Sequence, residues 1–221
     1  MTSRTVRVPA ARLGRWIEGF EERHGATGSE VVDGGLRLTG ADGATATLAP
    51  PFWVTGVPAS VSEFLDSAVQ LPRCAVILVR RGGFAAAIVD SSGVLASGLG
   101  RRHVQGRTAA GGWSQQRFAR RRQKQADELV DAAAARAAEV FLPAPTSSAP
   151  TSVEYVVTGG DRPLVQQVLA NPILRPLQGI PVGPHLAVPD PRRDVIDGLP
   201  EQLTQVRIDL VDPLSPGAGA P

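Results

Sequence analysis

A single long helical pattern constrains this fold more than any other feature of the sequence. From about Arg117 to Phe141, apolar residues recur at the spacing of an α-helix and form a stripe along one face. The stripe consists of Ala126, Leu129, Ala133, Ala137 and Val140. The opposite stripe is basic. Its cations stand at positions i, i+3, i+4 and i+7, and they are Arg117, Arg120, Arg121 and Lys124.

Strands are predicted on either side of this helix. Two apolar strands at 75–79 and 84–89 are joined by a glycine turn, and a third runs from 94 to about 104 and becomes basic toward its end. A three-stranded meander therefore precedes the helix. A Pro/Ser/Thr/Ala linker at 143–150 follows it. The remaining predicted elements are a strand at 153–157, a helix at 163–169 capped by Asp161, irregular chain at 181–191, a helical segment at 195–203 and a strand at 206–210.

The pattern of the first 70 residues predicts a separate, small α+β unit. Its elements are a strand at 5–8, a helix from Pro9 to His24, three short strands at 30–33, 36–39 and 45–48, and a helix at 61–69. A length of 221 residues suits one core domain with an annex. The predicted organisation is an α+β domain at 1–70, a second domain at 71–212 and a disordered tail at 213–221.

Composition places the chain among folded globular proteins. Hydrophobic residues make up 43% of it and charged residues 20%, which is enough to bury a core. No apolar run approaches the roughly 20 residues of a membrane span. The N-terminus does not resemble a signal peptide. We therefore expect a cytoplasmic protein with no membrane partner.

Cysteine and histidine give no sign of a metal centre. Cys74 is the only cysteine, which excludes an internal disulfide and a Cys-rich zinc site. It borders an apolar strand, where cysteine is usually an inert small hydrophobe, and a reactive thiol is the alternative. His24, His103 and His185 are scattered along the chain. No metal or cofactor is expected.

The formal net charge of +2 hides a strongly basic segment. Between Arg101 and Gln125 no Asp or Glu offsets the cations, which are Arg101, Arg102, Arg107, Arg117, Arg120, Arg121, Arg122 and Lys124. Cations in the first turns of a helix oppose its macrodipole, and a phosphate would relieve that repulsion. The segment predicts a surface that faces nucleic acid, with a solvated helix face as the alternative. His103 is either a surface histidine or an RNA contact.

A glycine-rich loop, predicted at 105–116, connects the basic strand to the basic helix. Gly111 and Gly112 lead into Trp113, and an aromatic residue gains nothing there unless it packs or stacks on a nucleotide base. The loop is rich in Gly, Ala, Ser and Thr and has one packing anchor. We therefore expect it to be mobile in the free protein and to become ordered on RNA.

The segment from Gly111 to Arg122 reads Gly-Gly-Trp-Ser-Gln-Gln-Arg-Phe-Ala-Arg-Arg-Arg. It resembles the GGQ segment of eukaryotic and archaeal class I peptide-chain release factors, where Gly-Gly-Gln-Ser precedes an Arg-Phe-Ala-Arg helix start. It also resembles the Vms-type peptidyl-tRNA hydrolases of ribosome quality control, and most closely their actinobacterial release-factor-like relatives. The resemblance covers about residues 74–212 and leaves out the first 70.

This resemblance implies an α/β fold with an RNase H-like mixed sheet flanked by helices and a catalytic loop before a long helix. The implied reaction is hydrolysis, by water, of the ester between a nascent peptide and the terminal adenosine of tRNA, without an acid–base triad. The implied partners are peptidyl-tRNA and the peptidyl-transferase centre of a stalled ribosome or large subunit. The domain at 1–70 then becomes a hypothetical docking module, and a monomer is expected.

The catalytic residue is expected at Gln115, with Gln116 as the alternative. Counting without gaps from the shared Gly-Gly, the family's glutamine position is occupied here by Trp113. Vms-type proteins use a looser Gly-x-x-Gln pattern, which the residues from Gly112 to Gln115 fit. The loop and RNA-binding residues expected beside the glutamine are Arg107, Gly111, Gly112, Trp113, Ser114, Arg117, Arg120, Arg121, Arg122 and Lys124.

Two other functions stay open at this point. One is a non-catalytic RNA- or ribosome-binding module, whose binding would survive the loss of Gln115. The other is a nuclease that cleaves tRNA near its CCA end. The sequence does not distinguish ester cleavage from phosphodiester cleavage.

Overall fold

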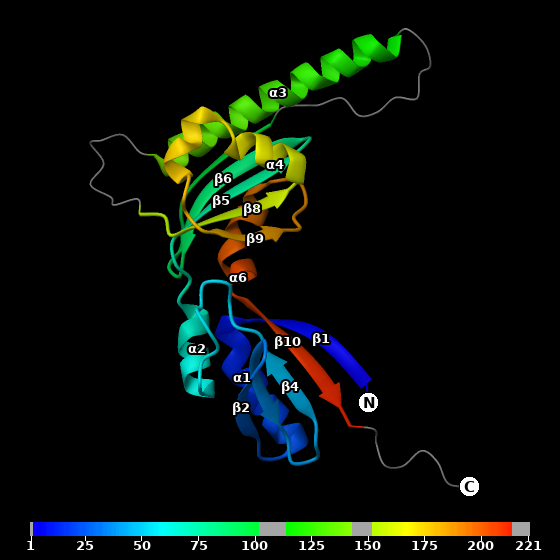
Figure 1. The fold of residues 1–221 in the computed structure, drawn as a ribbon, viewed down its shortest axis with the longest axis vertical. Coiled ribbons are helices and arrows are strands. Elements are labelled where there is room, and N and C mark those ends of the chain that lie inside the picture. Colours follow the sequence, from blue (N-terminus) through cyan, green and yellow to red (C-terminus); the bar gives the residue numbers. More distant parts are fainter. Residues whose placement is uncertain (1, 102–113, 143–151, 214–221) are drawn as a thin grey trace. The chain divides into compact units, whose positions relative to one another are not determined.

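The computed structural model describes residues 2–101, 114–142 and 152–213, and the side chains of the long helix only from Arg120 onward, Arg122 excepted. The chain forms two compact units (Figure 1). The first combines the residues up to Leu71 with those from Glu201 onward, and the second spans Pro72–Pro200. Each unit has a sheet with helices beside it, so the predicted α/β class is confirmed.

An antiparallel sheet with the strand order β1-β10-β4-β3-β2 organises the first unit. The bounds are β1 Thr2–Pro9, β2 Gly28–Val32, β3 Gly35–Thr39, β4 Thr45–Leu48 and β10 Gln205–Asp212. β1 pairs with β10 from Thr2 opposite Asp212 to Pro9 opposite Gln205. The first and the last strand that the structure describes therefore lie side by side.

The position of β10 corrects the predicted domain boundary. The sequence predicts a strand at 206–210 but groups it with the second domain at 71–212. In the structure Val206, Ile208 and Leu210 are buried in the core of the first unit. The alternation of apolar and polar residues shows that one face of a strand is buried, but it does not show to which sheet the strand belongs. The predicted tail lies, from residue 214 onward, outside the described residues.

Two helices complete the first unit. α1 (Ala10–His24) begins after Pro9, as predicted, because the fixed φ of proline suits the start of a helix. α2 (Val61–Val69) has the predicted bounds, and the Ser60 hydroxyl accepts a hydrogen bond from the Glu63 N–H at 3.2 Å. The buried residues of these helices are Ala10, Leu13, Ile17, Phe20, Phe64 and Ala68.

His24 and Asp42 join the end of α1 to the β3–β4 turn. Nδ1 of His24 lies 2.9 Å from Oδ2 of Asp42, and Oδ1 of Asp42 accepts a hydrogen bond from the Ala44 N–H at 2.9 Å. These bonds, that of His24 above all, hold the pKa of Asp42 below its ordinary value of 3.8.

Asp42→Asn is expected to lower stability at neutral pH and to have little effect in acid. Because the folded-state pKa is depressed, the carboxylate stabilises the fold above its ordinary pKa of 3.8, and this contribution is lost as the pH falls through the folded-state pKa. Urea midpoints of the two proteins, measured from neutral pH downward, should therefore converge. A difference that is constant with pH would contradict the assignment.

A mixed sheet with the strand order β7-β6-β5-β8-β9 organises the second unit. β7, β6 and β5 are antiparallel neighbours, whereas β5, β8 and β9 run parallel. The bounds are β5 Cys74–Arg80, β6 Gly83–Asp90, β7 Gly93–Gly100, β8 Tyr155–Gly160 and β9 Val182–Leu186. The predicted meander and the RNase H-like mixed sheet are both confirmed.

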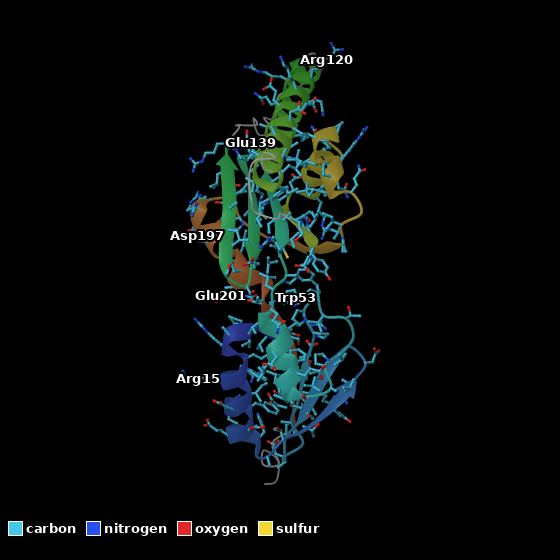
Figure 2. All side chains as sticks on the ribbon, turned by 90° about the vertical axis from the view of Figure 1, so that its left-hand side faces the viewer. Arg15, Trp53, Arg120, Glu139, Asp197 and Glu201 are labelled. Atoms are coloured by element: carbon cyan, nitrogen blue, oxygen red, sulfur yellow. The ribbon has the colours of Figure 1, made fainter. Side chains whose placement is uncertain are left out.

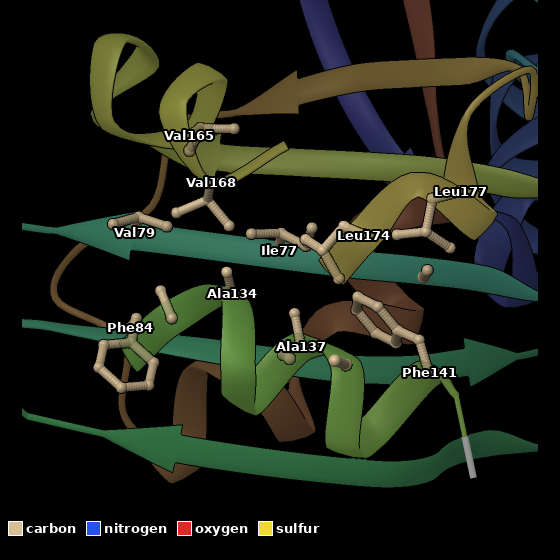
Figure 3. Close-up of a cluster of buried hydrophobic side chains, with 14 of the residues drawn as sticks. Ile77, Val79, Phe84, Ala134, Ala137, Phe141, Val165, Val168, Leu174 and Leu177 are labelled. Atoms are coloured by element: carbon tan, nitrogen blue, oxygen red, sulfur yellow. The ribbon is translucent and has the colours of Figure 1, made fainter. Parts of the chain in front are cut away.

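Helices pack on this sheet around a common core. They are α3 (Ser114–Phe141), α4 (Arg162–Leu169) and a short 3₁₀ helix, η1 (Pro172–Leu177). Figure 3 shows Ala137 of α3, Val168 of α4 and Leu174 of η1 gathered over the strands. Asp161 caps α4 as predicted, since its Oδ1 accepts a hydrogen bond from the Leu164 N–H at 3.4 Å. Two short helices, α5 (Arg193–Asp197) and α6 (Leu199–Leu203), occupy the predicted helical segment.

Some elements of the second unit differ from the prediction. β9 lies in the stretch 181–191, for which the sequence predicts irregular chain. The strand was missed because Gly183 and Pro184 interrupt the alternation of apolar residues. Proline is tolerated in β9 because this strand is at the edge of the sheet. β7 ends at Gly100, and the rest of its predicted extension lies, from residue 102, outside the described residues. The same holds for the predicted linker at 143–150.

Gly100 lies under the ring of Phe84, its partner on the neighbouring strand. A Cβ added at Gly100 would overlap the ring atoms of Phe84. Gly100→Ala is therefore expected to cost about 1–3 kcal/mol of unfolding free energy, as overpacking does. Urea unfolding measures this, with Gly28→Ala in β2 as the control, because nothing lies within 4 Å of a Cβ added there. Equal losses in both variants would mean that the Phe84 ring moves aside.

Candidate nucleic-acid interface

Helix α3 begins earlier than the sequence predicts. The expected start is at about Arg117, but the helix starts at Ser114, so Gln115 and Gln116 belong to its first turn and not to the preceding loop. Serine suits a helix start, and Gln and Arg are good helix formers, which explains the earlier start. The structure does not describe the other predicted loop residues, which are Arg107, Gly111, Gly112 and Trp113. The expected mobility of the loop therefore stays a prediction.

Among its described side chains, α3 packs on the core of the second unit from Ala126 onward. Its described side chains from Arg120 to Glu128 are exposed or half-buried, and Leu129 is the first that is buried. Ala133 and Ala137 continue the buried stripe, as predicted. At 1.5 Å per residue, about 22 Å of helix precedes Leu129. Figure 1 shows this part of α3 extending beyond the sheet of the second unit.

The projecting half of α3 presents cations on the face away from the core. Arg120, Arg121 and Lys124 are exposed and lie opposite the buried stripe, as their spacing predicts. Figure 2 shows Arg120 near the outer end of the helix, far along it from Glu139. The side chains of Arg117 and Arg122 are not among those described.

Charge is segregated along α3. Acidic residues begin only at Asp127, which accepts a hydrogen bond from Gln123 at 2.8 Å, and Glu128 lies 4.0 Å from the Lys124 ammonium. The Lys124 and Glu128 side chains are 79% and 53% exposed, so this ion pair neutralises the basic end only weakly. No carboxylate among the described side chains pairs with Arg120 or Arg121.

The dipole of α3 adds to this positive potential. The first turn of the helix has no acidic residue, so the positive end of the macrodipole and the nearby cations repel one another. A bound anion would relieve that repulsion, and phosphate is recognised by arginine and by helix N-termini. The projecting half of α3 can therefore accept a polyanion.

The cysteine and the histidines of the described ranges are buried or hydrogen-bonded within their own units. Cys74 is buried, and burial raises the pKa of its thiol to about 12, so it is inert at neutral pH. His185 bonds to the Thr158 hydroxyl at 2.9 Å through Nδ1 and to the Gly160 carbonyl at 3.1 Å through Nε2. His103 lies outside the described residues. In the described ranges no three His, Cys, Asp or Glu side chains come together as a metal site requires.

The mixed sheet and the long helix that carries basic residues form the architecture that the sequence resemblance to release-factor central domains implies. Residues 72–209 match the family model described as the Actinobacteria/chloroflexi VLRF1 release factor, and the chain belongs to that family. The match begins at the start of the second unit and ends within β10. A search of curated proteins finds no match to the chain. Membership of a release-factor family implies an interaction with the ribosome.

None of the helices in the described ranges combines the length and the apolar character that a membrane crossing requires.

Proposed function

We propose that this chain is a peptidyl-tRNA hydrolase that releases nascent peptides from stalled ribosomes or large subunits. Family membership supports a role in release or rescue. The observation that carries the proposal is the projecting half of α3, whose exposed Arg120 and Arg121 follow a first turn that contains Gln115. About 22 Å of α3 precedes its first buried residue, so the start of the helix can reach into an RNA cavity that the domain itself cannot enter.

The proposed reaction is attack of water on the carbonyl carbon of the ester. The bond between that carbon and the ribose oxygen of the terminal adenosine breaks, the ribose oxygen gains a proton, and the peptide leaves as an acid. Gln115 positions the water and stabilises the developing oxyanion, while the ribosome and tRNA supply the rest. Its place in the first turn of α3 supports this role, because the first four N–H groups of a helix have no partner within it and carry positive charge.

Gln115 and Gln116 are not equivalent in this arrangement. Successive positions of an α-helix differ by about 100° around its axis, so a substrate on one side meets only one of them directly. The Gly-x-x-Gln pattern favours Gln115, and Gln116 is the alternative. The proposed loop and RNA-binding residues beside them are Arg107, Gly111, Gly112, Trp113, Ser114, Arg117, Arg120, Arg121, Arg122 and Lys124.

The decisive experiment uses stalled large subunits with peptidyl-tRNA labelled on both the peptide and the tRNA. Free peptide together with full-length tRNA is the expected result. Peptide that remains attached to a shortened tRNA would identify a CCA-end nuclease instead. Binding with no change in either label would identify a non-catalytic module. A parallel incubation without protein corrects for spontaneous ester hydrolysis.

We also propose the first unit as the docking element. β1 pairs with β10 along its length, so removal of residues 1–70 alone would leave β10 without its unit. A meaningful deletion therefore removes both segments and keeps Pro72–Pro200. Weaker co-sedimentation of that shortened chain with large subunits is expected, and unchanged co-sedimentation would exclude the docking role.

A further inference from the structure

Exposed arginines gather at one end of the second unit's sheet. Arg80 and Arg81 lie at the β5–β6 turn, Arg101 follows β7 and Arg162 opens α4, and all four are exposed. Pairing places the first three together, because Arg80 is opposite Gly83 and the neighbouring Phe84 is opposite Gly100. We call Arg80, Arg81, Arg101 and Arg162 the arginine cluster.

Backbone contacts bring the start of α4 to the same end of the sheet. The Asp161 N–H donates a hydrogen bond to the Val79 carbonyl at 2.7 Å, directly beside Arg80. Asp161 Oδ2 also lies 3.9 Å from Nε of Arg81. Arg162, the next residue, is therefore adjacent to the β5–β6 turn.

Helix α3 leaves the sheet at this end. In Figure 3 the helix runs from the side of Phe84 and Val79 toward Phe141, which lies near Leu177 at the opposite end. The half of α3 that precedes this packed segment therefore projects from the Val79 end. The arginine cluster thus lies at the base of the projecting basic helix, within the same unit.

Two contacts limit how far these arginines can move. Nε of Arg80 donates a hydrogen bond to the Val188 carbonyl at 3.0 Å, which uses one of the five donors of its guanidinium. Cγ of Arg101 lies 3.7 Å from the position of a Cβ at Gly83, so its stem lies against the turn. Arg81 is 68% exposed, and its ion pair with Asp161 is therefore weak.

Acidic residues only partly offset this charge. Asp161 already caps α4, and an oxygen of Asp190 lies 3.5 Å from the position of a Cβ at Gly82. Four arginines against these two aspartates leave an excess of two positive charges, before Arg120 and Arg121 of α3 are counted. The planar fork of arginine matches the geometry of a phosphate.

We propose that the arginine cluster binds backbone phosphates of the large-subunit ribosomal RNA around the opening that α3 enters. This inference rests on the proposed function for the place of α3. Along the helix, Gln115 lies about 21 Å from Leu129, where α3 meets the sheet. When Gln115 reaches the end of tRNA in the peptidyl-transferase centre, the cluster stays about that far behind it. At that distance from the reacting ester, the phosphates that we propose to meet the cluster are those of the ribosomal RNA that lines the opening.

The test measures the affinity of the full-length protein for vacant large subunits, without tRNA, over a range of salt concentrations. The variant Arg81→Ala/Arg162→Ala is expected to bind roughly tenfold more weakly. Its plot of log affinity against log salt should be shallower by about 1.4 to 1.8, because two phosphate contacts are lost. The matched control is Arg175→Ala/Arg192→Ala, which removes the same charge from exposed positions outside the cluster. It should keep the parent affinity and slope.

Three results would overturn the proposal: unchanged affinity of the cluster variant, an equal loss in the control, or a loss seen with free tRNA but not with vacant subunits. Arg101→Ala alone should give about half of the slope change, and it provides the answer if the double variant unfolds. Vacant subunits carry no ester, so this result does not depend on peptide release. Failure of the hydrolase proposal would instead appear only in the labelled-peptide assay.

Discussion

Replacement of Gln115 by alanine is expected to reduce peptide release by a factor of about 10²–10³, the usual effect of removing one positioned donor to an oxyanion. The fold should not change, because the position precedes the first buried residue of α3, Leu129, by more than three turns. Alanine is also the best helix former, so the first turn is retained. Release rates on stalled large subunits, measured at saturating protein, test the chemical step separately from binding.

Two neighbouring substitutions serve as controls for Gln115→Ala. Gln116→Ala should leave most of the activity, because its position differs by about 100° around the helix axis. Trp113→Ala should reduce activity less than Gln115→Ala, since a loop aromatic contributes placement rather than charge stabilisation. Loss of release in Gln116→Ala but not in Gln115→Ala would shift the catalytic register by one residue. Full release by both glutamine variants would exclude the release-factor mechanism for this chain.

Charge reversal at Arg120 and Arg121 is expected to have the second-largest effect. Arg120→Glu/Arg121→Glu replaces two exposed cations, which we propose to contact phosphates, with anions, so affinity for large subunits should fall by more than about tenfold and the salt dependence should flatten. Folding should be maintained. A glutamate at 120 stands four residues before Lys124, and such pairs stabilise a helix by about 0.2–0.5 kcal/mol. The helix is therefore not weakened while its interface is reversed.

The control for this reversal is Arg175→Glu/Arg192→Glu, which makes the same change in net charge at exposed positions away from the projecting half of α3. If this control lost as much affinity as the α3 variant, the effect would come from net charge and not from the projecting helix. If neither variant lost affinity, the basic stripe would be a solvated helix face. Circular dichroism of both variants checks that the helix content is unchanged.

Much of the fold follows from local patterns in the sequence. α2 has its predicted bounds, and the Asp161 cap of α4 is observed, because hydrophobic period and capping chemistry act over a few residues. The buried stripe of α3 was predictable for the same reason. The strand β9 could not be predicted, since Gly183 and Pro184 interrupt its apolar pattern. Its regular backbone depends on pairing with β8.

Local sequence patterns could not assign β10 to a sheet, because that assignment depends on long-range pairing. Val206, Ile208 and Leu210 alternate as a half-buried strand should, and this pattern is the same whichever sheet accepts it. The partner, β1, lies near the other end of the chain, and nothing within either segment specifies the match. The candidate site shows a similar division. The spacing of Arg120, Arg121 and Lys124 predicts their common face, but the arginine cluster forms only through the β5–β6–β7 register and the place of α4.

The pairing of β1 with β10 has a consequence for the order in which the protein is made. Synthesis produces β1 to β4 first, then the whole second unit, and β10 last. Because β10 is the neighbour of both β1 and β4, the first sheet stays incomplete throughout most of translation. The second unit has its own core and can fold co-translationally before the N-terminal strands have their partner β10. Each new molecule therefore completes its first unit, and any docking surface on it, only after β10 has emerged from the exit tunnel of the ribosome that made it.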